Sequence, residues 1–226
     1  MKKMYYFTDD FPFLQIIRSM IGTKDFQQLH FVKNYSKFKR EEDQSTIFHK
    51  KFYENYSKME KLFDKFVEEN IQCLYGEPIV YQSIPTFRVH LPGNLAVGEW
   101  HKDKDYRDAS WAEQVKEDNF FVPLTSAYGT NTVWSESREG WGDFSPIEAE
   151  YGEMIQWDAS NLTHGNKENM TGQTRVSFDF RVIPESRYVD SDHLTINTKV
   201  PFSLGEYYKK SKMVYNTIET VLQIRS

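Results

Sequence analysis

A run of alternating side chains from Gln173 to Ile183 constrains the fold of this chain more than any other stretch. Successive residues of a β-strand point to opposite faces, so an alternating run predicts a strand with two unlike faces. The even-numbered residues are mostly apolar, and the odd-numbered residues as far as Arg181 are polar or charged. The two sets are Thr174, Val176, Phe178, Phe180 and Val182, and Gln173, Arg175, Ser177, Asp179 and Arg181.

Short strand-like runs separated by glycine and proline occupy the middle of the chain, and helical patterns flank them on both sides. Apolar residues recur at three- and four-residue spacing from Phe48 to Cys73, which predicts a helix packed outside a sheet. Near the C-terminus, Ser203-x-x-Glu206 fits a capping box at the start of another helix.

These elements predict a mainly β fold with flanking helices, of the α+β class. Many short strands between helices favour a double-stranded β-helix, the jelly-roll or cupin architecture, with N-terminal and C-terminal helices packed outside. The length of 226 residues allows one domain with a sizeable core. We expect a mostly helical part over residues 1–75, a β-helix core over 82–184 and a C-terminal helix over 203–224.

Composition excludes several classes of protein. A formal net charge of −5 with scattered basic residues gives no electrostatic reason to expect nucleic-acid binding. No apolar run approaches the length of a membrane span, and the N-terminus lacks a signal-peptide core. The single cysteine, Cys73, excludes an internal disulfide and suits a reducing compartment. We therefore expect a cytoplasmic protein, and we expect it to be a monomer or a homodimer.

Three residues form a candidate metal site. If residues 98–104 form a strand, His101 and Asp103 share one face of it and can bind the same ion. His164, further along the chain, can supply a third ligand. Two imidazoles and one carboxylate with open positions opposite are typical of non-haem iron(II) oxygenases. Glu99 falls on the same strand face and is a possible neighbour or competing ligand.

The order of these motifs is more specific than any one of them. Phe87-Arg88-Val89-His90-Leu91-Pro92 precedes the His-x-Asp motif, and Thr163-His164-Gly165-Asn166 and Thr174-Arg175-Val176-Ser177 follow it. This set resembles the iron(II)- and 2-oxoglutarate-dependent oxygenase superfamily, in particular its small-molecule branch, which includes a streptomycin-biosynthesis oxygenase. The resemblance runs from about Gln82 to Pro184.

The resemblance implies a hydroxylase that uses Fe(II), O2 and 2-oxoglutarate and releases succinate and CO2. It implies that the iron ligands are His101, Asp103 and His164, and that Arg175 binds the far carboxylate of 2-oxoglutarate. The polar face of the 173–183 strand would then line a barrel interior. We further expect cosubstrate contacts from Ser177 and Asn119, and substrate contacts from four residues: Arg88, Glu136, Arg181 and Trp134. No catalytic residue is expected beyond the metal ligands.

Two other functions are compatible with a histidine-containing barrel. One is a non-oxidative cupin, such as a sugar isomerase or epimerase, which Glu99 would favour as an additional ligand and which leaves Arg175 without a role. The other is a non-catalytic cupin that binds a metal or a sugar. The substrate of an oxygenase would be a small polar metabolite, such as a sugar, an aminocyclitol or an amino acid derivative.

Overall fold

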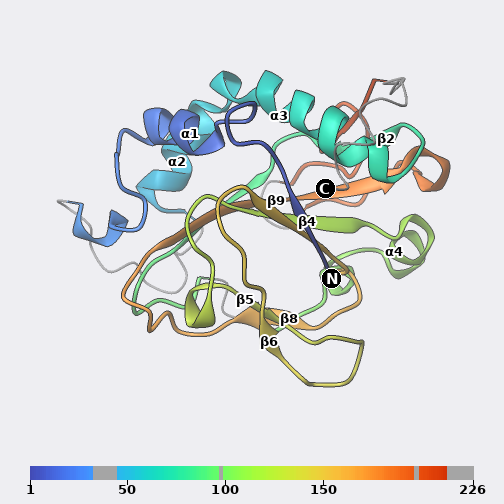
Figure 1. The fold of residues 1–226 in the computed structure, drawn as a ribbon. Helices are drawn as coiled ribbons and strands as arrows, with labels where there is room; N and C mark the ends of the chain where they lie inside the picture. The colour runs from blue at the N-terminus through green and yellow to red at the C-terminus, as the bar shows by residue number, and fades with distance from the viewer. Residues whose placement is uncertain (33–44, 97–98, 196–198, 213–226) are drawn as a thin grey trace.

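Two antiparallel sheets form the framework of the protein (Figure 1). The computed structural model describes residues 1–32, 45–96, 99–195 and 199–212. In these residues, the larger sheet has seven strands in the order β1-β7-β4-β9-β2-β10, and β3 also pairs with β9. Its strands are β1 (Lys2–Tyr5), β2 (Ile79–Gln82), β3 (Thr86–His90), β4 (Asp118–Pro123), β7 (Glu153–Trp157), β9 (Arg175–Pro184) and β10 (Tyr208–Lys210).

The smaller sheet has three strands in the order β6-β5-β8. They are β5 (Val133–Ser135), β6 (Ser145–Pro146) and β8 (His164–Asn166). This sheet lies on the opposite side of the large sheet from helices α1 to α3 (Figure 1). The predicted combination of strands with flanking helices is confirmed at this level, as a mixed α+β fold with antiparallel sheets.

The helices are short and most of them precede β2. The α-helices are α1 (Phe13–Ile21), α2 (Ile47–Glu54), α3 (Glu60–Phe66) and α4 (Ala109–Val115). The single turns are η1 (Leu29–Phe31), η3 (Tyr56–Lys58), η4 (Val67–Ile71), η5 (Gln72–Leu74), η6 (Asp103–Tyr106), η7 (Gly129–Asn131) and η8 (Glu185–Arg187). None of the helices described has the length and apolar character needed to cross a membrane.

Strand β9 runs through the centre of the large sheet and joins most of its parts. One edge of β9 pairs with β4, and the other pairs first with β3 and then with β2. Its even-numbered residues from Val176 to Val182 are buried in the largest apolar core of the protein. The alternating pattern therefore predicted both the strand and its apolar face correctly.

Helices α1 to α3 cover that apolar face of the large sheet (Figure 1). Aromatic rings make much of the contact: Phe13 meets Phe178 edge-on with ring centres 5.1 Å apart, and Phe63 meets Phe180 at the same distance. Edge-on ring pairs of this kind add to the free energy gained from burying apolar area. The predicted position of the helices outside a sheet is confirmed.

The helix predicted over residues 48–73 is broken into several pieces. Thr46 caps α2 by accepting hydrogen bonds from the N–H groups of Phe48 and His49, and α2 ends before Asn55. After Asn55 the chain continues through a single turn into α3. The apolar side chains of these short pieces still face the core. Those that are buried include Phe52, Tyr56, Met59, Phe63, Phe66 and Val67.

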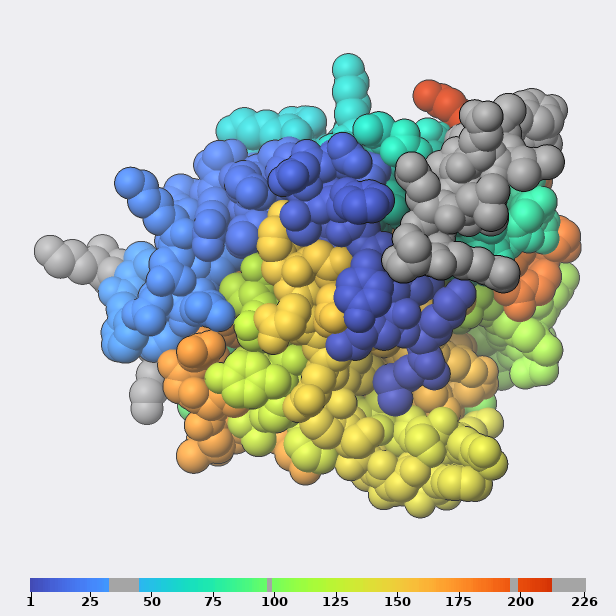
Figure 2. Space-filling model, viewed as in Figure 1, coloured from blue at the N-terminus to red at the C-terminus, as the bar shows by residue number. Residues whose placement is uncertain are grey.

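The N-terminal strand β1 closes one edge of the large sheet. It pairs antiparallel with β7 from Lys2 opposite Gln156 to Tyr5 opposite Glu153. In the space-filling view the N-terminal residues, in dark blue, lie against the residues near 150, in yellow (Figure 2). The large sheet thus uses strands from outside residues 82–184, where we expected the whole β core to lie.

The C-terminal helix predicted over 203–224 is wrong for the part that the structure describes. Residues 208–210 form β10, which pairs antiparallel with β2 and places Tyr208 opposite Gln82. The capping-box pattern is a local signal, whereas β2 would otherwise present unpaired backbone groups at the edge of the sheet. Pairing with β10 satisfies those groups and buries Tyr208 completely. Residues 213–226 lie outside the described residues.

Candidate metal centre

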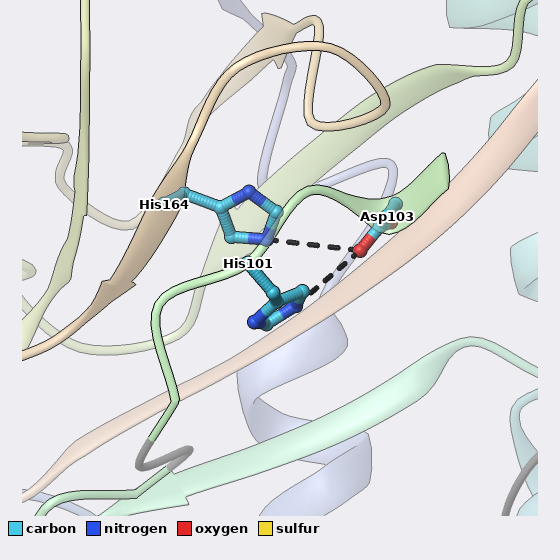
Figure 3. Close-up of side chains that lie close together, drawn as sticks. All are labelled: His101, Asp103 and His164. Carbon is cyan, nitrogen blue, oxygen red and sulfur yellow. Dashed lines mark ion pairs between the residues drawn. The ribbon is translucent and has the colours of Figure 1, made fainter. Parts of the chain in front are cut away.

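His101, Asp103 and His164 converge as the sequence predicted (Figure 3). One candidate ligand atom from each residue lies within 4.8 Å of the other two. The Nε2 atoms of His101 and His164 lie 3.6 Å and 3.7 Å from Oδ1 of Asp103. Two imidazole nitrogens and one carboxylate oxygen therefore face a common point and can hold one metal ion.

The predicted strand over residues 98–104 does not form in its described part. His101 makes a single bridge to His164 through two backbone hydrogen bonds, of 3.0 Å and 2.9 Å. The chain then bends, because the N–H of Asp103 donates to the carbonyl of Ala159 and η6 begins at Asp103. The carboxylate reaches the histidines from the start of a helical turn, although strand alternation had been expected to place it there.

Backbone carbonyl groups fix the orientation of both imidazole rings. Nδ1 of His101 lies 2.8 Å from the carbonyl oxygen of Glu99, and Nδ1 of His164 lies 3.0 Å from that of Leu162. A carbonyl oxygen can only accept, so we assign the ring proton to Nδ1 in each histidine. The lone pair of each Nε2 is then directed toward Asp103. A hydrogen bond on the outer nitrogen of a ligating histidine is a usual feature of metal sites.

The two oxygens of Asp103 have different partners. Oδ1 faces the imidazoles, whereas Oδ2 accepts hydrogen bonds from Nη2 of Arg181 at 2.6 Å and Nε of Arg181 at 3.1 Å. Oδ2 also accepts from the side-chain amide of Asn119 at 3.0 Å. Nη1 of Arg181 donates in turn to Gln82 and to the hydroxyl of Tyr207. Asp103 is therefore held with one oxygen left for a metal ion.

The local charges keep Asp103 ionised. Burial by itself would raise the pKa of the Asp103 carboxyl, but Arg181 and the two imidazoles lower it well below its usual value. Burial lowers the pKa of both imidazoles. For His101 the Asp103 carboxylate and the Glu99 carbonyl outweigh burial and raise the pKa, whereas for His164 burial prevails and the pKa is lowered.

A pocket extends from this cluster between the two sheets. At the other end of β9 from Arg181, Arg175 is 1% exposed and also lines the pocket. Its Nε donates to the carbonyl of Asn131, and its Nη1 donates to the hydroxyl of Ser177 at 2.8 Å. The full lining is Arg88, Ala96, His101, Asp103, Asn119, Phe121, Val133, Trp157, His164, Gly165, Asn166, Arg175, Asp179 and Arg181.

Comparison with known proteins assigns the chain to a family. No family model matches it. The streptomycin biosynthesis protein StrG of Streptomyces griseus is 39% identical to it over 209 residues, which cover 91% of this chain and 96% of StrG. This chain belongs to the StrG family.

Solved structures are more distantly similar to this StrG-family chain. The structure described as CytC3 with Fe(II) and alpha-ketoglutarate is 11% identical, with a TM-score of 0.47 and coverage of 81% of this chain and 72% of CytC3. HygX from Streptomyces hygroscopicus, with nickel and 2-oxoglutarate bound, is 11% identical, with a TM-score of 0.45 and coverage of 93% of this chain and 91% of HygX. The family assignment rests on the StrG sequence alone.

Most of the other predicted site residues of this StrG-family chain lie at the pocket. Arg88, Asn119 and Arg181 line it. Nε of Arg88 donates to Oδ1 of Asp179 at 2.8 Å, which forms an ion pair on the floor of the pocket between β3 and β9. Ser177 is fully buried beneath the pocket, where its hydroxyl oxygen accepts a hydrogen bond from Arg175. The polar face of β9 therefore lies inside the molecule, as the sequence predicted.

Two predicted substrate residues lie elsewhere. Trp134 occupies the outer face of the small sheet, where its Nε1 donates to Gly129 and the ammonium group of Lys167 lies over its ring. Glu136 accepts hydrogen bonds from the N–H groups of Thr163 and Gly142, and the Thr163 bond is the main cause that lowers its pKa to about 2. Neither residue lines the pocket. Trp134 follows Val133 in β5, and since Val133 lines the pocket, the Trp134 side chain points to the other face. The Glu136 carboxylate is held by its bonds to the Thr163 and Gly142 N–H groups.

Sequence reasoning missed or misassigned three residues around the cluster. The side chain of Glu99 is exposed and outside the metal cluster, and only its carbonyl takes part by orienting His101. Asp179 was placed on the correct face but was not recognised as the partner of Arg88. Tyr207, which supports Arg181, could not be found, because it lies in the segment that was predicted to be a helix.

Proposed function

We propose that this protein is an iron(II)- and 2-oxoglutarate-dependent dioxygenase that hydroxylates a small polar metabolite and releases succinate and CO2. The observation that most supports this proposal is that His101, Asp103 and His164 converge in one pocket. A buried arginine, Arg175, lines the same pocket. In this proposal the whole chain forms one oxygenase domain.

The donor set fits iron(II). Two imidazoles and one carboxylate are borderline and hard ligands, and three protein ligands leave further positions for small molecules. The absence of cysteine from the cluster argues against a structural zinc site. The outer atoms of all three ligands are already held by hydrogen bonds, so the inner atoms are preoriented for the ion. When bound, the iron with 2-oxoglutarate and oxygen would supply the oxidising chemistry for C–H hydroxylation.

Arg175 is the residue we propose for the distal carboxylate of 2-oxoglutarate. Its planar guanidinium suits a carboxylate better than a lysine ammonium does. Asn131 and Ser177 anchor two of its nitrogens, so the side chain is held in place before a ligand arrives. Asn119 lies beside Asp103, on the metal side of the same pocket, and is proposed as a further cosubstrate contact.

The rest of the pocket excludes water and orients the substrate. Phe121, Val133 and Trp157 provide apolar walls, and a dry site limits side reactions of a strong oxidant. The lining comes from both sheets, with Arg88 and Asn119 on the large sheet and His164 on the small sheet. This arrangement supports the double-stranded β-helix as the architecture of the core.

The proposed substrate class is a sugar, an aminocyclitol or an amino acid derivative. Membership of the StrG family supports this choice, since StrG is named for the biosynthesis of streptomycin. The Arg88–Asp179 ion pair in the pocket offers both a donor and an acceptor to hydroxyl or amino groups of such a molecule. No contact of the described residues favours the isomerase alternative, because Glu99 stands outside the cluster.

Two measurements test the proposal. Anaerobic addition of iron(II) and 2-oxoglutarate to the protein should give the weak visible absorption band of an iron-bound keto acid. A panel of aminocyclitols, sugars and amino acid derivatives should then contain a compound that stimulates succinate release in air. If the protein binds iron but gives neither the band nor any succinate, the non-oxidative cupin functions are correct instead.

A further inference from the structure

Gly165, directly after the metal-ligand candidate His164, is a glycine for steric reasons. Its φ is not in the left-handed region that favours glycine, unlike the φ of the other glycines described. A Cβ atom at this position would lie 2.8 Å from Cδ2 and 3.0 Å from Cγ of Trp100. Carbon atoms do not approach so closely without a shift of one of them. The missing side chain therefore allows the Trp100 indole to lie directly on the backbone of β8.

Trp100 is 40% exposed, and its ring contacts Gly165 and Phe144. The atoms nearest to Gly165 belong to the rigid part of the indole close to its attachment, so a rotation of the far end of the ring does not relieve the contact. The same ring also meets Phe144 edge-on, with ring centres 4.6 Å apart. A side chain at position 165 would therefore displace the part of the indole next to its attachment to the backbone of Trp100.

The backbone at Trp100 leads directly to the metal cluster. Trp100 precedes His101 and Gly165 follows His164, and the two histidines are joined by two backbone hydrogen bonds. Because side chains alternate, the indole and the missing Cβ lie on one side of this bridge and the imidazoles lie on the other. The imidazole ring centres are 4.5 Å apart.

We propose that the Trp100–Gly165 contact sets the separation of His101 and His164 and so positions both metal ligands. Trp100 and Gly165 are positioning residues in this account, because they act on the two histidines through the backbone bridge. The inference rests on the proposed metal site. Position 165, after His164, must lack a side chain because the Trp100 ring occupies the space of a Cβ atom.

A double-mutant cycle tests the inference, with iron(II) affinity measured anaerobically by titration calorimetry. Gly165→Ala should weaken iron(II) binding by about tenfold, a usual loss when support for a metal ligand is disturbed. Trp100→Ala removes the obstacle, so the double variant Gly165→Ala/Trp100→Ala should bind iron(II) within about threefold of Trp100→Ala alone. The d–d absorption spectrum with cobalt(II) should change in Gly165→Ala and return toward that of the parent in the double variant.

A matched control separates steric rescue from a general loss of aromatic packing. Trp134 lies opposite Gly165 in the β5–β8 ladder, but all three atoms nearest to the added Cβ belong to Trp100. Gly165→Ala/Trp134→Ala should therefore bind iron(II) no better than Gly165→Ala. The inference is overturned if Gly165→Ala binds like the parent, or if the Trp100→Ala double variant does not fold or does not recover. Failure of the parent itself to bind iron(II) would instead refute the proposed function.

Discussion

The two faces of strand β9 are built from neighbouring residues and follow opposite physical rules. Phe178 and Phe180 lie in the aromatic core under the helices, where volume and burial determine the free energy. Asp179 and Arg181, each one residue further along the chain, lie in the pocket, where they form ion pairs with Arg88 and Asp103. The core face should therefore control stability, and the pocket face should control the binding of ligands.

The largest effect expected on the pocket face comes from removing a metal ligand. His164→Ala leaves two ligands and should abolish iron(II) binding at concentrations that saturate the parent, together with succinate release. Its metal-free thermal midpoint should stay within a few degrees of the parent, because the bridge to His101 uses backbone atoms. Calorimetric titration and thermal melts with and without iron(II) measure both properties. His193→Ala, which changes an exposed histidine, serves as the control; unchanged iron binding in His164→Ala would refute the ligand assignment.

The largest effect expected on the core face is on stability. Phe180 is fully buried against Phe63 and Phe120, and Phe180→Ala should lower the free energy of unfolding by about 3–5 kcal/mol. Iron(II) affinity of the folded protein should change by less than about threefold, because the ring lies on the face away from the cluster. Urea unfolding and calorimetry at a temperature where the variant is folded provide the test. A large loss of iron affinity would show that the two faces are coupled.

Arg175 tests the cosubstrate end of the pocket. A charge-assisted hydrogen bond to a carboxylate contributes about 1.5–3 kcal/mol, so Arg175→Ala should weaken 2-oxoglutarate binding at least about tenfold. Arg175→Lys should restore only part of the affinity, since it keeps the charge and loses the planar fork. Iron(II) affinity without 2-oxoglutarate should barely change. Arg187→Ala, at the surface, is the control; equal 2-oxoglutarate affinity in Arg175→Ala and the parent would make Arg175 a structural residue.

The smallest expected effect concerns His49, a buried histidine of helix α2, which lies on the core side of the large sheet. Burial is the main cause that lowers the pKa of His49 to about 3, and its Nε2 is buried without a hydrogen-bond partner. The unfolded chain therefore binds a proton that the folded protein does not bind between pH 6.5 and pH 3. This contribution of His49 to stability is fully present well above pH 6.5 and is lost as the pH falls, by about 1 kcal/mol from pH 6.5 to pH 5.5.

Replacement of His49 removes this dependence. In His49→Phe the free energy of unfolding of the metal-free protein should fall less steeply between pH 6.5 and pH 5.5, by about the same 1 kcal/mol. Urea unfolding at pH 6.5 and pH 5.5 measures the difference between the parent and the variant. Equal slopes would mean that His49 is protonated, or becomes accessible to water, in the folded protein.

Local periodicity determined much of this protein. Alternation in β9 predicted one apolar face and one polar face, since the side chains of a strand point to opposite sides whatever the surrounding fold. The expected role of Arg175 in binding a carboxylate then predicted that the polar face lies inside. The aromatic stripe from Phe52 to Val67 likewise predicted a buried face, although the helix is interrupted. The order of His101, Asp103, His164 and Arg175 in the sequence predicted a three-residue cluster, which the structure brings together, and an arginine, which lines the same pocket.

Contacts between distant segments decided the rest. The 203–206 pattern was compatible with a helix, but pairing with β2 drew residues 208–210 into the sheet, because an open edge gains more from hydrogen bonds than a short exposed helix gains from its cap. Asp103 reaches the histidines through a turn that Ala159 stabilises. Its support by Arg181, and the close approach of Trp100 to Gly165, join residues far apart in the sequence, and only the packing of the two sheets brings them together.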